Sequence, residues 1–433
     1  MRGRHAITVA ARHGAAPLIG KSRETMAGPL VGLRVLDLSR VMAGPWCTQI
    51  LSDLGAEVIK VERPGDGDDT RHWGPPWLKA RDGTDTREAA YYLSANRGKY
   101  SVAIDIGGDK GRNLILALAE RSDVFIENFK VGGLAAKGLG YDDLSALNPG
   151  LIYCSITGFG QTGPKASEAG YDYLIQGAGG LMSITGVPDG MPGAGPQRVG
   201  LAVADLTTGM YATIGILSAL HHREKTGRGQ YIDLALLDTQ VGWLANQALN
   251  YFTGGKVPTR TGAWHPNLAP YQPFAASDGE VILAIGNNGQ FRKFCDFAGK
   301  PELAEDPRFR TNPDRVQNRA ALETEIATLI AAKPRDHWLT GLPRLGVPCG
   351  AINDIAQAFE EPQVKARGMK IELPHPQAGT VPGIANPLKF SETRIEYRKA
   401  PPLLGEDTDE VLARVLGLGA DEISELRADG VIG

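Results

Sequence analysis

The sequence is poor in the features that mark secreted, metal-binding and membrane-spanning proteins. Only four cysteines occur in 433 residues, with no C-x-x-C pair and no histidine at metal-ligand spacing. Scattered cysteines of this kind are typical of reduced, structural thiols in a cytoplasm-like compartment, and no metal site is expected. No uninterrupted apolar run reaches the ~18 residues that a membrane span needs. Residues 199–220 come nearest, but they contain Asp205 and predict a core helix.

An excess of charge of one sign is also lacking. The 46 basic and 49 acidic residues give a formal net charge of −3. This balance argues against a nucleic-acid or membrane partner. Apolar residues make up 42% of the chain and charged residues 22%, which are ordinary values for a globular protein. The length allows two or three domains.

The first 27 residues differ in composition from the rest. They carry five lysine or arginine residues against a single acid, Glu24, and no apolar block long enough for a secretion signal. Two interpretations stay open: a disordered leader upstream of a start near Met26, or an organelle transit peptide. The first places the protein in the cytoplasm and the second in an organelle matrix. The scarcity of serine favours the first.

Familiar catalytic signatures are missing as well. No P-loop, G-x-S-x-G elbow or H-E-x-x-H motif occurs in the chain. The glycine-rich stretch "GAGGLMSITG" does not follow a strand at the spacing of a dinucleotide-binding loop, so it does not predict a Rossmann fingerprint. Function must therefore be sought in how the chain is organised.

Strand and helix patterns alternate through the first ~230 residues, which predicts a parallel α/β sheet covered by helices. Buried strands are predicted at 32–39 and 57–64, and in "YSVAIDI", "DVFIENF" and "LIYCSITGFG". Polar, glycine-rich loops follow the strand ends: "SRVMAGP", "ERPGDGDDTR", "ENFKVGG" and "TGFGQTGP". Such loops share one rim of a parallel sheet, and ligands bind there.

The pattern changes after about residue 250. "PYQPFAASDGEVILAIGN" predicts two strands joined by a turn, and a charged helical region follows. We therefore expect a large domain over 28–230, a linker helix over 231–250 and a smaller α+β domain over 251–350. Residues 351–433 are expected to form a linker and a C-terminal segment that returns to the large domain.

The stretch "AGYDYLIQGAGGLMSITG", residues 169–186, poses the main functional question. Asp172 precedes an apolar helical pattern, and aspartate is a favoured helix N-cap. A carboxylate held ionised near the positive end of a helix can also act as a covalent nucleophile. The glycines that follow would let a bulky substrate approach the backbone. From the residues alone, both roles stay open.

A series of motifs, in order, resembles the class III CoA-transferase family, also described as CaiB/BaiF-like. The resemblance rests on "GLRVLDLSRVMAGPWCTQILSDLGAEVIKVERPGDGDDTRHWGPP", "YYLSANRGKYSVAIDI", "DVFIENFKVGGLAAKGLGY", "YCSITGFGQTGPKASEAGYDYLIQGAGGLMSITG" and "VADLTTGMYA", and it continues through "PPLLGEDTDEVL". It covers nearly everything after residue 27. It implies a Rossmann-like large domain built from both chain ends, an inserted small domain, and an interlocked homodimer whose active site uses both subunits.

The resemblance also implies a covalent mechanism centred on Asp172. Its carboxylate would attack an acyl-CoA thioester to give an anhydride, and the CoA thiolate would then form an aspartyl-CoA thioester. CoA and acyl-CoA would be substrates, and no permanently bound cofactor is implied. The loop made of Gly286, Asn287, Asn288 and Gly289 corresponds to a mobile glycine loop that shields the intermediates from water.

The family pattern further implies which residues contact the ligands. The CoA-binding candidates are Val41, Met42, Ala43, Arg63, Asn96, Arg97, Lys99, Asn128, Phe129, Lys130 and Lys137. The candidates for contact with the acyl group or its distal carboxylate are Tyr171, Arg71, His265 and Asn267. Members that act on formyl and oxalyl groups carry glutamine at the position of Met42, so those substrates are disfavoured. The resemblance favours a succinyl-CoA donor and a dicarboxylate acceptor such as glutarate.

Two alternatives stand beside CoA transfer. α-Methylacyl-CoA racemases of the same superfamily carry histidine where this chain has Tyr171, and their distant glutamate falls near Asp238. The acid–base pair for proton transfer therefore looks incomplete. A non-catalytic CoA-binding protein would be expected to have lost Asp172.

Overall fold

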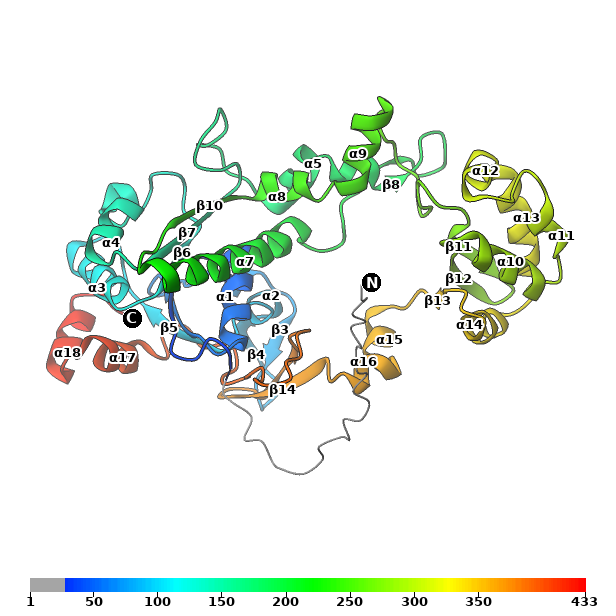
Figure 1. The fold of residues 1–433 in the computed structure, drawn as a ribbon. Helices are drawn as coiled ribbons and strands as arrows, with labels where there is room; N and C mark the ends of the chain where they lie inside the picture. The colour runs from blue at the N-terminus through cyan, green and yellow to red at the C-terminus, as the bar shows by residue number, and fades with distance from the viewer. Residues whose placement is uncertain (1–27) are drawn as a thin grey trace, which may run out of the picture.

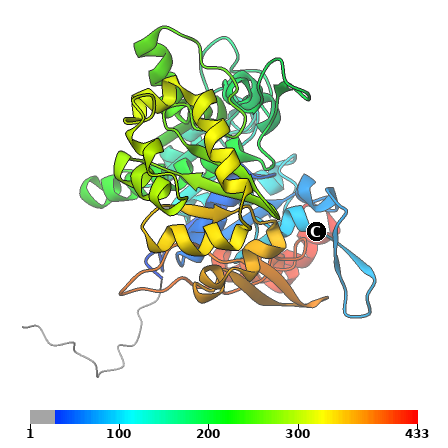
Figure 2. The ribbon, with the colours of Figure 1, turned by 90° about the vertical axis from the view of Figure 1, so that its right-hand side faces the viewer.

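A computed structural model describes residues 28–433. The predicted leader, residues 1–27, lies outside the described residues. Figure 1 shows a large domain, built from the first half of the chain together with its C-terminal end, and a small domain at the opposite side of the molecule. Figure 2, turned by 90°, shows the C-terminal helices beside the large domain.

Six parallel strands form the central sheet of the large domain, in the order β10-β7-β6-β1-β2-β5. This confirms the predicted parallel α/β fold. Because the strands are parallel, their carboxyl ends meet at one rim. The strands are β1 (Arg34–Asp37), β2 (Glu57–Glu62), β5 (Lys99–Ala103), β6 (Val124–Glu127), β7 (Ile152–Thr157) and β10 (Tyr231–Ala235).

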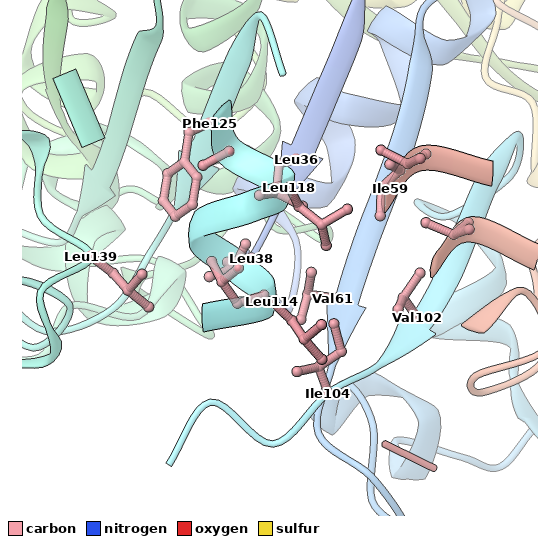
Figure 3. Packing of buried hydrophobic residues seen from close by; sticks show 14 of the residues in the cluster. Leu36, Leu38, Ile59, Val61, Val102, Ile104, Leu114, Leu118, Phe125 and Leu139 are labelled. Carbon is pink, nitrogen blue, oxygen red and sulfur yellow. The ribbon is translucent and has the colours of Figure 1, made fainter. Parts of the chain in front are cut away.

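Most side chains at the strand centres are apolar because both faces of the sheet are covered, although charged residues such as Lys60 of β2 and Lys99 of β5 are buried as well. Successive side chains point to opposite faces, so Val35 of β1 packs in one hydrophobic cluster and Leu36 in the other. Figure 3 shows the second cluster, in which Ile59 of β2 and Phe125 of β6, on either side of β1, pack together with Leu118 of the covering helix. Burial on both faces fixes the strand register, since a one-residue slip would exchange the two faces.

Helices cover each face of the sheet. One face carries α1 (Ala43–Asp53), α5 (Asp172–Ala178), α7 (Val203–Thr226) and α8 (Leu236–Gly242). The other carries α3 (Asp109–Glu120), α4 (Tyr141–Leu147), and the C-terminal α17 (Thr408–Val411), η3 (Leu412–Leu416) and α18 (Ala420–Ala428). Short elements in the connections are η1 (Asp69–His72), β3 (Trp77–Lys79), β4 (Asp85–Ala89), α2 (Ala90–Leu93), η2 (Ala135–Lys137), α6 (Leu181–Ile184), β8 (Gly186–Val187) and β9 (Gly195–Pro196).

Two expectations about the middle of the chain meet different outcomes. The linker helix expected over 231–250 is wrong at its start, because residues 231–235 form β10 and pair with β7 before α8 and α9 (Ala245–Gly254) follow.

Within the described residues, α7 is the one helix with the length and hydropathy of a possible membrane span. Ala212 and Ile216 on one of its faces are fully buried against the sheet, as expected of a core helix.

The small domain is built on three antiparallel strands. β11 (Tyr271–Ala276) and β12 (Gly279–Ala284) form the predicted hairpin, and β13 (Cys349–Ala351) adds to β12. Its separate core contains the fully buried Phe294 and Trp338. The helices around it are α10 (Asn288–Phe297), α11 (Glu302–Glu305), α12 (Asn312–Gln317), α13 (Arg319–Ala331) and α14 (Arg335–Arg344).

The last part of the chain connects the small domain back to the large one. It runs through α15 (Ile355–Glu360), α16 (Pro362–Ala366), β14 (Lys370–His375) and β15 (Gly379–Ile384). The Asp407 carboxylate then accepts a hydrogen bond from the Ser101 backbone N–H at 2.9 Å. Val411 and Leu412 are fully buried in the same cluster as Ile59.

Candidate active site

Two neighbouring cavities lie beyond the carboxyl ends of the parallel strands. The first, of about 270 Å³, is lined by residues that follow β1, β2 and β5, including Arg63 and Ile104. The second, of about 340 Å³, is lined by residues that follow β1, β6 and β7, including Met42. Arg40 and Phe129 line both. The rim predicted from the strand-end loops therefore carries two adjacent hollows.

Arg40, which sequence reasoning misses, forms part of the boundary between the cavities. Its guanidinium lies 3.0 Å from Asp69 and 5.9 Å from the centre of the Phe129 ring. The Arg40 backbone N–H donates to Asn128 Oδ1 at 3.0 Å, and Asn128 Nδ2 donates to the Arg40 carbonyl at 2.7 Å. Asn128 thereby ties the loop after β6 to the loop after β1. A cation directly after a strand end was the available signal.

The predicted CoA-contact residues on these loops lie on the rim. Exposed Arg63 lines the first cavity, 3.5 Å from Asp66. Exposed Lys130 lines the second. Lys137 is half-buried in η2 and lines neither cavity. The second cavity is also lined by Val41, Met42, Ala43, Asn128 and Phe129.

Arg71, expected near a substrate carboxylate, is instead buried in the protein. Its Nε and Nη2 donate to the two Glu62 oxygens at 2.8 Å, and Nη1 donates to Glu88 at 2.9 and 3.0 Å. Nη2 also reaches the Tyr92 hydroxyl and the Pro402 carbonyl. The side chain is 3% exposed. Its donors are taken up by protein acceptors, so the expected substrate contact is corrected to a structural role.

Asn96, Arg97 and Lys99 require the same correction. Arg97 forms a two-pronged pair with buried Asp53 at 2.9 and 2.6 Å. Lys99 Nζ donates to Asn96 Oδ1 at 2.9 Å and to the Pro45 carbonyl at 3.0 Å, and it is fully buried. Burial lowers the pKa of Lys99 to about 8. These side chains face carboxylates and carbonyls of the fold and not the rim, so they are not available to CoA here.

Asp172 does not cap its own helix, which corrects the cap hypothesis in its simple form. Tyr171 is the N-cap of α5 and Asp172 is its first residue. Asp172 Oδ1 accepts backbone N–H groups of a different helix, α7, from Ala204 at 2.7 Å and Asp205 at 3.3 Å. Oδ2 accepts from Gln176 Nε2 at 2.7 Å. The half-buried carboxylate thus lies at the positive, N-terminal end of a 24-residue helix.

Gln176 fixes the orientation of this carboxylate and is a second residue that sequence reasoning misses. Its side chain is fully buried. The Val199 backbone N–H donates to Gln176 Oε1 at 2.9 Å, which leaves the amide nitrogen to face Asp172. Asp172 and Gln176 are four residues apart, one turn along α5. That spacing, visible in "DYLIQ", was the available signal.

Asp205 brings a second carboxyl group to the same place. It lines the second cavity together with Tyr171, the residue that precedes Asp172 in the chain, whereas Asp172 itself is not part of the lining. Within the described residues, no hydrogen bond or ion pair engages the Asp205 carboxyl group, because the nearby backbone N–H donors serve Asp172. Burial, and then the Asp172 charge, raise the pKa of Asp205 to about 7. Asp205 therefore keeps its proton to a higher pH than an ordinary aspartate does.

The candidate residues of the small domain do not reach these cavities within one chain. His265 and the exposed Asn267 and 286–289 line neither of them. Asn267 instead bonds to Asn250 at 3.2 Å. Figure 1 shows the small domain across the molecule from the strand-end rim. The single chain therefore holds an incomplete version of the expected site.

The comparisons with known proteins decide the family. A model of CoA-transferase family III matches residues 30–408. The chain belongs to this family. A succinate–glutarate CoA-transferase of Agrobacterium fabrum is 48% identical over 387 residues, which cover 89% of this chain and 96% of the relative. The human succinyl-CoA:glutarate CoA-transferase is 44% identical over 406 residues, 93% of this chain and 90% of the relative.

The structural comparison agrees with the family assignment. The crystal structure of a CAIB/BAIF family protein from Brucella suis has a TM-score of 0.79 and 50% sequence identity, and it covers 90% of this chain and 100% of that chain. As a family III CoA-transferase, this chain is an enzyme that uses CoA thioesters as substrates. The racemase alternative gains nothing from the site, because Asp238 is exposed and lines neither cavity.

The titration of Asp205 predicts a pH-dependent stability of the transferase. In the unfolded chain Asp205 ionises near its ordinary pKa of 3.8, but in the folded protein it ionises near 7. Between these values the folded state binds more protons, so wild-type stability falls as pH rises. An Asp205→Asn variant escapes this loss, and we expect it to be more stable than wild type by about 2 kcal/mol at pH 8.

Thermal midpoints of both proteins, measured from pH 4 to 8, test the Asp205 prediction. The difference in thermal midpoint between Asp205→Asn and wild type should grow between pH ~4 and ~7 and stay constant above pH ~7. Asp238→Asn, which removes an exposed acid that lines neither cavity, is the matched control. A pH-independent difference for Asp205→Asn would contradict the prediction.

Proposed function

We propose that this transferase moves CoA between succinyl-CoA and glutarate, with Asp172 as the covalent carrier. The observation that carries the proposal is the Asp172 carboxylate, held by two α7 backbone N–H groups and Gln176 beside the second cavity. The names of the relatives at 44–48% identity support this pair of acids. Met42, in place of the glutamine of formyl- and oxalyl-specific members, supports a larger acyl group.

The two cavities suit the two ends of an acyl-CoA. The nucleotide end of CoA carries phosphates, which require cations. Arg40 and Arg63 supply them at the first cavity, whose wall also offers Ile104 as an apolar surface for the adenine. The pantetheine arm would then pass the 41–43 loop into the second cavity, which brings the thioester toward Asp172.

The reaction balances without an outside proton donor or redox partner. Asp172 attacks the succinyl thioester carbonyl and the C–S bond breaks. The products are a mixed anhydride of Asp172 and succinate, and free CoA thiolate. The thiolate attacks the Asp172 carbonyl carbon and expels succinate, leaving an aspartyl-CoA thioester. Glutarate attacks this thioester and releases the thiolate. The thiolate then attacks the glutaryl carbonyl, which frees glutaryl-CoA and restores the Asp172 carboxylate.

The hydrogen bonds of Asp172 assign different roles to its two oxygens. Oδ1 accepts from two backbone N–H groups, of Ala204 and Asp205. Oδ2 accepts from the side chain of Gln176. We infer that Oδ2 attacks, and that Oδ1 remains the carbonyl oxygen, whose charge develops when the thiolate attacks Asp172. Rigid backbone donors aimed at that oxygen would act as an oxyanion hole.

Gln176→Leu tests this assignment. The change preserves side-chain size but removes the amide that orients Oδ2, and we expect kcat to fall by about 10- to 100-fold with a smaller change in KM. Steady-state kinetics with succinyl-CoA and glutarate measure both constants. Gln161→Leu, which removes a side-chain bond to Ser155 away from Asp172, is the control. Equal kinetics for Gln176→Leu and wild type would contradict the assignment.

We further propose that a second copy of the chain completes the site, in the interlocked homodimer that the family resemblance implies. The glycine loop at 286–289 cannot line the Asp172 cavity of its own chain as folded here. Large apolar side chains are also left exposed on the helices near the site, including Tyr173 of α5, Ile214 of α7 and Phe252 of α9. Sedimentation of the full chain tests this, and a catalytically active monomer would overturn it.

An assay with defined donors and acceptors tests the proposed function. The purified protein is incubated with succinyl-CoA and a panel of dicarboxylates and monocarboxylates, and the CoA esters are separated by chromatography. Glutaryl-CoA should form fastest, with one succinate released for each CoA ester made. Formation of succinate without any new CoA ester would indicate hydrolysis. Exchange of the α-proton of a branched acyl-CoA would favour the racemase alternative instead.

A further inference from the structure

The loop between β1 and α1 contains a backbone conformation that its residue type disfavours. Val41 has φ of +71°, and it is one of two non-glycine residues with positive φ among residues 28–433. A β-branched residue in this region is an outlier, because its side chain crowds its own backbone. Val41 lines the second cavity, and the next residue, Met42, is the N-cap of α1. The unfavourable conformation therefore shapes the wall of the site.

Asp68 is the group that holds this conformation. The Val41 N–H is shared between the two Asp68 carboxylate oxygens, each at 3.2 Å. The same carboxylate accepts from the backbone N–H of Thr70 at 3.0 Å and from its hydroxyl at 2.7 Å. The Asp68 side chain is fully buried. Thr70 of η1 thus determines where the Asp68 carboxylate lies, and the carboxylate in turn positions the Val41 N–H.

Lys60 of β2 binds both Asp68 and the loop that contains Val41. Its Nζ lies 2.8 Å from Asp68 Oδ2 and 2.9 Å from the carbonyl of Ser39, in the same loop as Val41. Burial alone would raise the pKa of Asp68, but the Lys60 charge outweighs it and lowers that pKa to about 2. The pair is 1% exposed or less, so solvent does not screen it. A buried ion pair is weak support for stability but can specify one conformation.

We propose that the buried Lys60–Asp68 pair is a positioning device for CoA, which keeps the 39–42 loop in the strained conformation that the second cavity requires. This inference rests on the proposed function, because it assigns the loop to the path of the pantetheine arm. Asp68 and Lys60 line the first cavity but not the second, so Asp68 acts on the second cavity through its bond to the Val41 N–H. Its loss should therefore be felt in CoA binding through the backbone of Val41.

A double-mutant cycle between Asp68 and Val41 tests the proposal. Asp68→Asn should weaken CoA binding about tenfold, because Val41 is released toward negative φ. Glycine adopts positive φ freely, and Val41→Gly also removes a side chain that lines the second cavity, so the Kd of Val41→Gly for CoA is the reference against which the double variant is judged. Combined with Asp68→Asn, Val41→Gly should restore most of the lost affinity. Calorimetry with CoA as the ligand measures all four proteins without requiring turnover.

Controls separate positioning from general stability. Asp53→Asn removes a different buried acid, which lies in α1 and pairs with Arg97. Val41→Gly should not restore CoA affinity in that variant. Thr70→Val removes a single bond to Asp68 while the ion pair stays, and it serves as a milder variant if Asp68→Asn folds poorly. It should weaken CoA binding about two- to threefold and be rescued by Val41→Gly in the same way.

The outcomes distinguish the inference from the proposed function. If wild type binds no CoA, the proposed function fails and the inference with it. If wild type binds CoA but Val41→Gly rescues neither the Asp68 nor the Thr70 variant, only the inference fails. The same is true if Asp68→Asn binds CoA as wild type does.

Discussion

An Asp172→Asn variant is expected to lose CoA transfer by at least about 10³-fold while keeping its folded stability. The amide oxygen can still accept the N–H groups of Ala204 and Asp205, so the N-terminus of α7 stays satisfied, although the bond from Gln176 Nε2 is lost because the amide nitrogen that replaces Oδ2 is itself a donor. The amide is no nucleophile, so no anhydride or thioester can form on it. Asparagine therefore removes catalysis and retains the helix contact, which separates the two roles that the sequence leaves open.

Mass spectrometry and Asp172→Ala complete this test. After rapid quenching with succinyl-CoA, the wild-type peptide that holds Asp172 should carry a CoA thioester, and both variants should lack it. Alanine also removes the contact with α7, so we expect about 1 kcal/mol of destabilisation for Asp172→Ala and little for Asp172→Asn. Activity in Asp172→Asn close to that of wild type would show that the residue only supports the helix.

An Arg71→Met variant is expected to be destabilised by about 3–5 kcal/mol, the largest stability effect that the site region predicts. Removing the guanidinium leaves Glu62 and Glu88 buried without the cation that pairs with both of them. Arg71 also bonds the Pro402 carbonyl, so the C-terminal segment loses a contact with the large domain. Burial already raises the pKa of Glu88, and loss of the Arg71 charge would raise it further.

Chemical and thermal unfolding of Arg71→Met measure this effect. Arg63→Met, at an exposed arginine of the same loop, should change stability by less than about 0.5 kcal/mol and weaken CoA binding instead. Arg71→Met should therefore lower the free energy of unfolding, whereas Arg63→Met should raise the KM for succinyl-CoA. If Arg71→Met folds like wild type and loses affinity for glutarate, the structural role assigned to Arg71 is wrong and the substrate contact is right.

The fold was largely predictable because both faces of the sheet are buried. A strand such as β1, with Val35 in one cluster and Leu36 in the other, presents apolar side chains to both faces of the sheet, and that pattern is local. The strand β10 was not predictable in the same way. It is five residues long and runs directly into α8, so its apolar residues continue a helical pattern. Pairing with β7, more than 70 residues earlier, decides its structure.

The family, the parallel sheet, the strand-end rim and the candidacy of Asp172 could be predicted from the residues, because ordered motifs and apolar periodicity are local properties. Tertiary structure alone decided which charges are free. Arg71 and Arg63 look alike in sequence, yet only Arg71 meets Glu62 and Glu88 in the interior. It alone placed Asp172 against Ala204, 32 residues later. A buried charge or a carboxylate takes its chemistry from donors and acceptors that only packing brings within hydrogen-bond distance.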